Sequence, residues 1–358
     1  MSASRLKFEG CQQFRYRVVA SLLSGKQLKI TRIRTDADQP GLHDFEANFL
    51  RLIELLTDGS SIEINDTGTI LRFTPGLVVG GHQLVHDCGN SRSIGWFLEA
   101  VIPLLVFAKE NTHISLTGVT NDALDMSVDV IRNVTLPLLR NFGIAADLKI
   151  KKRGAPPNGG GVVEFSTSIV RELRPVALED MGLIRRVRGV AYSARVSPTI
   201  LTRVVDSARG VLNNLLPDVY IHTDHYKGSD GGNSPGYSLA LVAESTTGVL
   251  ISAEYTAEQG SVPEDIGTYG AALLLQEVRK GGVVDSSHQA LVLILMILCP
   301  EDVCKVRFGE LSENGIAILR LIRDSFGAVF KIKEDPETNT VMISCLGTGY
   351  RNVSRRAT

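Results

Sequence analysis

Paired cysteines, long apolar runs and an excess of one charge are all missing from this sequence of 358 residues. The five cysteines form no C-x-x-C pair, which argues against a zinc ribbon or a thioredoxin-type motif and predicts reduced thiols in the cytosol or nucleus. The net charge is −1, so any nucleic-acid binding must depend on a local basic patch. The opening MSASRLKFEG lacks the apolar region of a signal peptide, and we expect none.

The most apolar run, ALVLILMILC at 290–299, is too short to cross a bilayer, which takes about 20 residues. It predicts instead a helix that is buried on all sides. With 44% hydrophobic and 22% charged residues, the composition is that of an ordinary globular protein large enough for two domains.

An internal repeat is the main organising feature. Three segments each combine leucines, a polar turn, a glycine that can end a helix and an alternating strand: 52–64, 136–150 and 319–332. Gly59 and Gly143 are 84 residues apart, whereas Gly143 and Gly327 are 184 apart. The second interval is therefore 100 residues longer, which predicts a domain inserted at about Leu183 to Val283.

The repeat predicts an α/β (α+β) fold in which each unit contains two helices and closes with a pair of strands. The inserted segment has its own strands and helices and is expected to be a smaller α/β domain. The expected divisions are a core of 1–182 plus 284–358, with repeats at 1–78, 79–168 and 169–182 with 284–346, an inserted domain at 183–283, and a basic tail at 347–358.

An anion site is the first candidate for function. Arg32 and Arg34 are two residues apart and would share one strand face, while the NGGG loop would expose backbone N–H groups suited to phosphate oxygens. The alternative, which composition alone favours, is surface arginines plus a glycine-rich hairpin turn. The candidate residues for anion or RNA binding are Arg15, Arg17, Arg32, Arg34, Asn158, Gly159, Gly160 and Gly161.

A second candidate is a nuclease site of Arg323, Asp324 and Lys331, in which an acid and bases would support phosphodiester cleavage through a metal. The same residues also fit a helix C-terminus with solvent-facing charges. Elsewhere His222 and Asp224 lack a third metal ligand at a suitable spacing, and we expect neither a resident metal nor a cofactor.

The sequence resembles the RNA 3′-terminal phosphate cyclases over nearly its whole length. The segments that carry the resemblance are FEGCQQFRYR at 8–17, ITRIRTDADQPGL at 30–42, GVTNDALDMSVDVIRN at 118–133 and PPNGGGVVEF at 156–165. The resemblance implies three βαβαββ repeats with a smaller domain inserted in the third.

The departures from the cyclase pattern concern the chemistry. A cyclase forms a covalent nucleotidyl-histidine just after the strand that corresponds to CKVRFGEL, but Leu311 and Ser312 stand there and the last histidine is His288. The Gln-His pair that helps a cyclase grip its substrate appears as Phe45 and Glu46.

This combination resembles the eukaryotic cyclase-like proteins of ribosome biogenesis. The resemblance implies a protein of the nucleus and nucleolus without cyclase activity, which acts in 18S rRNA maturation within the small-subunit processome. Its implied partners are an assembly GTPase, snoRNA and pre-rRNA. The rival reading is an enzyme, either an endonuclease acting on pre-rRNA or a cyclase with a displaced nucleophile. The peripheral inserted domain is the expected partner surface.

Overall fold

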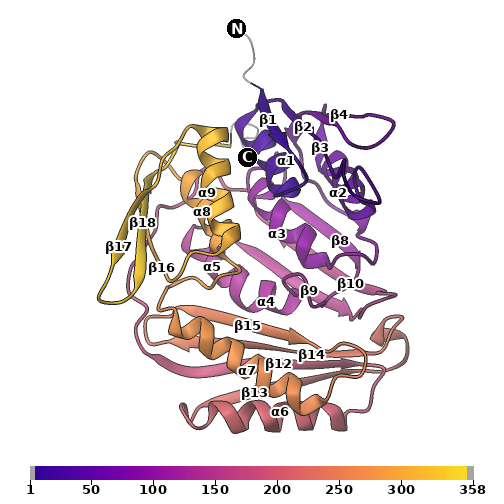
Figure 1. Ribbon diagram of the computed structural model, residues 1–358, viewed down its shortest axis with the longest axis vertical. Coiled ribbons are helices and arrows are strands. Elements are labelled where there is room, and N and C mark those ends of the chain that lie inside the picture. Colours follow the sequence, from indigo (N-terminus) through magenta and orange to yellow (C-terminus); the bar gives the residue numbers. More distant parts are fainter. Residues whose placement is uncertain (1–4, 353–358) are drawn as a thin grey trace.

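The computed structural model describes residues 5–352, in which helices and strands alternate along the chain (Figure 1). The predicted α/β class is confirmed.

The first unit contains β1 (Leu6–Glu9), α1 (Phe14–Ser24), β2 (Leu28–Thr31), α2 (Asp44–Leu56), β3 (Thr57–Asp58), β4 (Ser61–Ile64), β5 (Leu71–Thr74) and β6 (Leu77–Val78). The second contains β7 (Leu84–Asp87), α3 (Ile94–Leu105), β8 (Thr112–Gly118), α4 (Val128–Val130), the π-helical turn η1 (Ile131–Thr135), α5 (Leu136–Asn141), β9 (Ala146–Lys152) and β10 (Gly161–Thr167). The third contains β11 (Ala177–Leu178), α8 (Gln289–Ile297), β16 (Val303–Phe308), α9 (Glu313–Phe326), β17 (Lys331–Asp335) and β18 (Thr340–Leu346).

Each unit forms one four-stranded sheet, and the three sheets have the same strand order: β1-β2-β5-β4, β7-β8-β10-β9 and β11-β16-β18-β17. The first two strands of each unit are parallel. The remaining pairs are antiparallel. A helix connects the two parallel strands, as such a crossover requires; in the third unit, the chain between them also includes a further domain.

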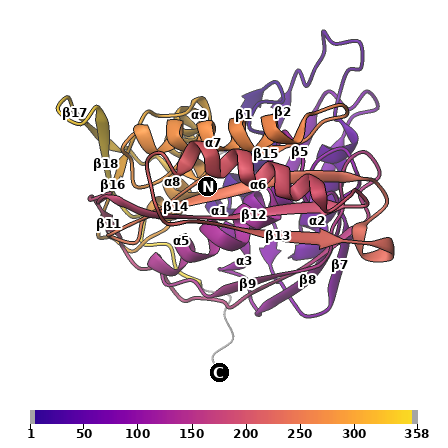
Figure 2. The same cartoon turned by 90° about the horizontal axis from the view of Figure 1, so that it is seen from below.

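That further domain builds a fourth sheet of order β13-β12-β14-β15. Its elements are β12 (Ile184–Ala194), α6 (Thr199–Leu212), β13 (Val219–Tyr226), the 3-10 turn η2 (Gly228–Gly231), β14 (Gly236–Ser245), β15 (Leu250–Thr256) and α7 (Pro263–Arg279). Helices α6 and α7 pack side by side over one face of the sheet (Figure 2). The other face packs on the second unit, where Ala240 and Val242 meet Val130 and Val134.

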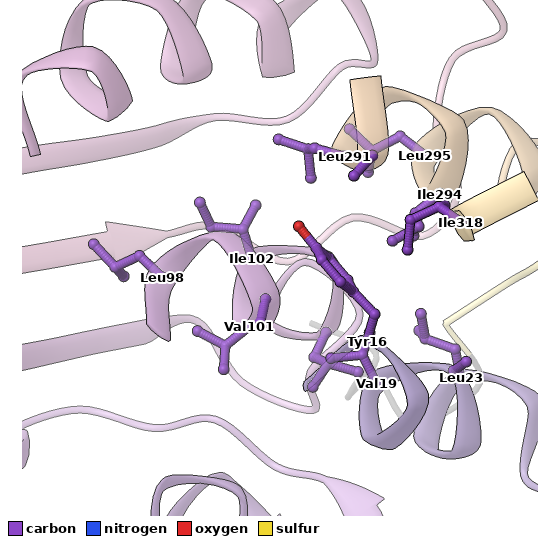
Figure 3. Packing of buried hydrophobic residues seen from close by; sticks show 14 of the residues in the cluster. Tyr16, Val19, Leu23, Leu98, Val101, Ile102, Leu291, Ile294, Leu295 and Ile318 are labelled. Carbon is purple, nitrogen blue, oxygen red and sulfur yellow. The ribbon is translucent and has the colours of Figure 1, made fainter. Parts of the chain in front are cut away.

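The first helices of the three units, α1, α3 and α8, contribute to one apolar core together with α9. Figure 3 shows side chains from these four helices pointing toward one another, with the Tyr16 hydroxyl directed between α3 and α8. Every residue of α8 is buried, as the apolar run at 290–299 predicts. Within residues 5–352, none of the helices has both the length and the apolar character needed to span a bilayer.

Two local predictions need correction. Gly59 does not end α2, because the chain enters β3 after Leu56 and Gly59 lies in the turn that follows. Strand β2 ends at Thr31, so Arg32 and Arg34 lie in a turn with positive φ rather than on one strand face. The tail docks as far as residue 352, with Tyr350 against Phe107 at 4.6 Å between ring centroids. Residues 353–358 lie outside the described part.

Candidate functional site

The segment after β16 is where the resemblance places a nucleophile. Ser312 is the N-cap of α9, and its hydroxyl accepts a hydrogen bond from the Gly315 N–H at 3.0 Å. The same hydroxyl donates to the Gln289 side-chain oxygen at 2.9 Å, and the Gln289 amide donates to the Glu310 carbonyl. Leu311 packs against the main core. Every side-chain group at this position therefore has a structural partner.

The cap gives a testable prediction. Ser312→Ala is expected to destabilise the protein by about 1 kcal/mol, because the first turn of α9 loses its acceptor. Ser312→Thr keeps the hydroxyl and is expected to retain most of that stability. Urea unfolding followed by circular dichroism measures both variants, and equal stability of the alanine variant and wild type would refute the role of Ser312 as a cap.

The opening motif of the chain lies against this segment. Gln13, in the left-handed conformation with φ 54°, donates from its side-chain amide to Asn314 Oδ1 at 2.8 Å. The two residues are 301 positions apart, so the first and third units meet here. The segment where the resemblance places the nucleophile is therefore in contact with a residue near the start of the chain.

Arg15, the first predicted anion ligand, is bound internally. Its guanidinium donates to the Glu99 carboxylate and to the Trp96 carbonyl oxygen, and the Tyr16 hydroxyl donates to the other Glu99 oxygen. Burial lowers the pKa of Arg15, but the charge and hydrogen bond of Glu99, together with Tyr16 and Asp125, outweigh burial and leave that pKa raised. Burial, with Glu99 nearby, holds the pKa of Tyr16 well above its ordinary value. An external anion would have to displace Glu99 to reach this arginine.

Arg34 is also paired. It forms a two-pronged ion pair with Glu46, at 2.6 and 2.9 Å, and donates to the Gly41 carbonyl. Glu46 is buried and also accepts from the His43 N–H at the start of α2. On the resemblance, Glu46 stands where a cyclase has one member of the Gln-His pair that binds substrate. In this chain Glu46 neutralises Arg34 instead.

The other two arginines differ in exposure. Arg17 is buried, donates to the carbonyl oxygens of Glu9 and Gly10, and lies over the Phe8 ring. Burial lowers the pKa of Arg17. Arg32 is largely exposed and lies 3.6 Å from Glu9, which is equally exposed. Of the four arginines, Arg32 is the most accessible to an external phosphate.

The glycine loop at 158–161 packs on the inserted domain. The Asn158 N–H donates to the Ser234 hydroxyl, and the Gly159 carbonyl accepts from the Asn233 N–H. A Cβ on Gly160 would lie only 2.5 Å from the Asn233 side chain, so glycine permits this close approach. Gly161 begins β10. The loop also packs closely on Asn90 and Gly118 of the second unit. An anion-binding role for it stays a prediction.

The residues of the alternative nuclease site lie near the surface. Arg323 and Asp324 form an exposed pair at 3.1 Å in the last turn of α9, and Lys331 begins the edge strand β17. Among residues 5–352, no cluster of three or more His, Cys, Asp or Glu side chains is placed to hold a metal ion.

A buried charge network surrounds Arg153, which belongs to the basic run KIKKRG at 149–154 and which nothing in the local sequence distinguishes from the lysines before it. Arg153 is fully buried and binds Asp129 at 2.5 and 2.9 Å and Asp224 at 2.9 Å. Its guanidinium also lies over the Tyr192 ring at 4.7 Å. Because Asp129 belongs to the second unit and Asp224 to the inserted domain, this arginine joins the two.

A second network surrounds His288, just before α8. Asp285 Oδ1 contacts the His288 ring nitrogen at 2.6 Å, and Asp285 Oδ2 accepts from both the backbone N–H and the hydroxyl of Ser252. The other ring nitrogen lies 2.8 Å from the Thr135 hydroxyl. These groups connect the inserted domain, η1 and α8. Nothing in the local sequence marks them, because the partners come from three distant segments.

The chain matches known proteins along its length. The model of the RNA 3′-terminal phosphate cyclase family matches residues 6–332. A probable RNA 3′-terminal phosphate cyclase-like protein of Dictyostelium discoideum is 48% identical, with 98% of this chain and 99% of that protein covered.

Two further relatives are similar to this chain over nearly its whole length. The RNA 3′-terminal phosphate cyclase-like protein of Homo sapiens is 48% identical, with 99% of this chain and 98% of that protein covered. The rRNA processing protein rcl1 of Schizosaccharomyces pombe is 44% identical, with 99% of each chain covered.

Proposed function

Because this chain belongs to the RNA 3′-terminal phosphate cyclase family, we propose that it is a member without cyclase chemistry that acts in ribosome biogenesis. Its role is in early pre-rRNA processing and 18S rRNA maturation. The name of the Schizosaccharomyces pombe relative supports the part of this role that concerns rRNA processing. The observation that carries the proposal is the segment after β16. There the hydroxyl of Ser312 caps α9 and Leu311 packs on the core, so no imidazole stands at the nucleophile's position.

The internal pairing of arginines supports the same conclusion. A cyclase must receive a terminal phosphate and a nucleotide, both anionic, and guanidinium groups suit such ligands. Here Glu99 neutralises Arg15, and Glu46 neutralises Arg34. The chain's own carboxylates thus pair with two of the guanidinium groups that could otherwise bind phosphates.

In this role the protein holds other components of the small-subunit processome in a geometry that permits processing. Its proposed partners are an assembly GTPase, snoRNA and pre-rRNA, in the nucleolus of the nucleus. The accessible Arg32 and the 158–161 loop remain the proposed points of contact with RNA phosphates. Depletion of the protein is expected to reduce mature 18S rRNA and leave 25S–28S rRNA at normal levels, whereas an equal loss of both would oppose a small-subunit role.

The pure protein is expected to form no covalent adduct with labelled ATP and magnesium, because a phosphoramidate needs an imidazole at the nucleophile's position. His43 packs on Phe45 at the start of α2, and His288 is buried against Asp285, so neither is a ready replacement. Gel autoradiography after incubation detects an adduct, with an authentic cyclase as the positive control. An acid-labile labelled band from this chain would establish the displaced-nucleophile reading instead.

The endonuclease alternative is tested with the same preparation. Incubation with a pre-rRNA fragment is expected to leave the RNA intact. Site-specific cleavage that Asp324→Ala abolishes, in a variant that remains folded, would replace the non-catalytic proposal with a nuclease.

A further inference from the structure

A cavity of about 700 Å³ lies between the second unit and the inserted domain. One wall comes from the loops that follow β7 and β8, including Asn90 and Asp122, and from Pro156 and Pro157 in the β9–β10 connection. The other comes from the C-terminal part of β12 and from the segments that flank β14 and β15. Its position outside the carboxyl ends of parallel strands is one where α/β proteins place ligands, and its volume is in the range of ligand sites.

A buried polar group lies in the wall of this cavity. Tyr192 lines it and is 1% exposed, and its hydroxyl makes no hydrogen bond of normal geometry within the described residues. The hydroxyl lies 3.9 Å from the Cβ position of Gly236, another lining residue. Burial raises the pKa of Tyr192, although the Arg153 charge and the Ser238 hydroxyl act against it, and the hydroxyl therefore stays protonated and able to donate. A buried donor without a partner is costly, and an acceptor on a ligand would satisfy it.

The charge of the cavity restricts the ligand. The two charged residues that line it, Asp122 and Glu258, are both acidic. Burial is the main reason that the pKa of Asp122 is raised; the nearby Asp125 charge adds to it, and the Arg92 charge acts against it. RNA or a free nucleotide would bring phosphates to this wall and find no lining cation to receive them. A cationic or neutral group fits instead.

The rim of the cavity indicates the size of the occupant. Leu124 lines the cavity and is 75% exposed, and Pro156, Pro157 and Pro235 are exposed lining residues beside it. Val262, next to the lining residue Ser261, is 47% exposed. A small metabolite inside the cavity would leave this apolar rim in water, whereas a chain that continues past the opening would cover it.

We propose that this cleft binds an extended segment of a partner protein that inserts an apolar side chain and places a lysine or arginine beside it. The apolar side chain packs among Leu124 and the prolines, the basic group meets Asp122 and Glu258, and a backbone carbonyl of the segment accepts from the Tyr192 hydroxyl. The inference rests on the proposed role as a binding factor and adds the site and the chemistry of a protein partner.

The full chain can be tested with a displayed library of random short peptides, followed by fluorescence anisotropy with the enriched peptides. Enriched peptides are expected to carry an apolar residue next to a basic one. Asp122→Asn, whose amide oxygen can still accept from the N–H groups of Leu124 and Asp125, is expected to weaken binding about tenfold. Tyr192→Phe and Leu124→Ser are each expected to weaken it about fivefold.

Leu183→Ser is the matched control, because Leu183 is 78% exposed and lies outside the cavity lining. It is expected to leave peptide affinity unchanged. The inference would be overturned if the peptides bound all four variants equally, or if the selected peptides lacked the apolar–basic pattern. It would also be overturned if a fluorescent single-stranded RNA bound more tightly than the peptides and lost its binding in Leu124→Ser. The 18S rRNA experiment does not depend on this cleft, so the proposed function can be supported even where one of these outcomes overturns the inference.

Discussion

Replacing Arg153 with methionine is expected to lower the free energy of unfolding by about 3–5 kcal/mol, because it removes the main counter-charge of the buried Asp129 carboxylate. The other cation near that carboxylate, Arg132, is partly exposed and lies farther away, at 3.4 Å. Arg153 has no exposed side-chain surface, and Asp129 has only 1%. Burial raises the pKa of Asp129, but the guanidinium outweighs burial and leaves that pKa lowered. Urea unfolding followed by circular dichroism, at neutral pH, measures the loss.

A double variant separates the missing charge from the missing contacts. Adding Asp129→Asn to Arg153→Met removes the stranded charge, and the pair is expected to recover at least half of the lost stability. Asp224 is 26% exposed and can be solvated, so it needs no compensating change. Arg203→Met serves as the surface control, since the Arg203–Glu264 pair is exposed on both sides. A double variant as unstable as the single one would show that packing, rather than charge, dominates.

The arrangement of the fold was accessible from the sequence because it depends on local patterns. Helix ends and alternating strands follow from short-range rules, and the unequal spacing of Gly59, Gly143 and Gly327 can be counted along the chain. The buried helix at 290–299 follows from its composition alone. Gly59 failed as a helix end because a short strand, β3, intervenes, and two residues of strand leave little pattern to read.

The site was predicted less well because its partners are distant in the sequence. Arg15 and Glu99 are 84 residues apart, and their pairing depends on how α1 packs against α3. The glycine loop was ambiguous for another reason. An anion site and a close backbone contact both require the absence of a Cβ, so Gly160 fits either, and only the position of Asn233 shows the contact. The replacement at Leu311 and Ser312 needed no tertiary information, because the missing group is a side chain.

The Asp285–His288 pair is expected to make stability depend on pH. Burial lowers the pKa of His288, but Asp285 outweighs burial and leaves it raised; for Asp285 burial raises the pKa, and His288 leaves it lowered. The contribution of His288 is therefore full below its unfolded pKa of about 6.5 and is lost as the pH rises through its folded pKa. The contribution of Asp285 is full above about pH 3.9 and is lost as the pH falls through its folded pKa.

Both contributions are thus complete between about pH 4 and pH 6.5. Glu254 is a complication, because burial raises its pKa to about 7 and it titrates in the same range. The stability difference between wild type and His288→Gln removes the part of the Glu254 titration that does not depend on His288; the Glu254 charge also helps to raise the pKa of His288. That difference is expected to be largest near pH 6 and to shrink steadily toward pH 9, as the imidazolium loses its proton. A difference that is flat from pH 6 to pH 9, or one that His222→Gln at an exposed histidine reproduces, would mean that His288 does not carry the charge.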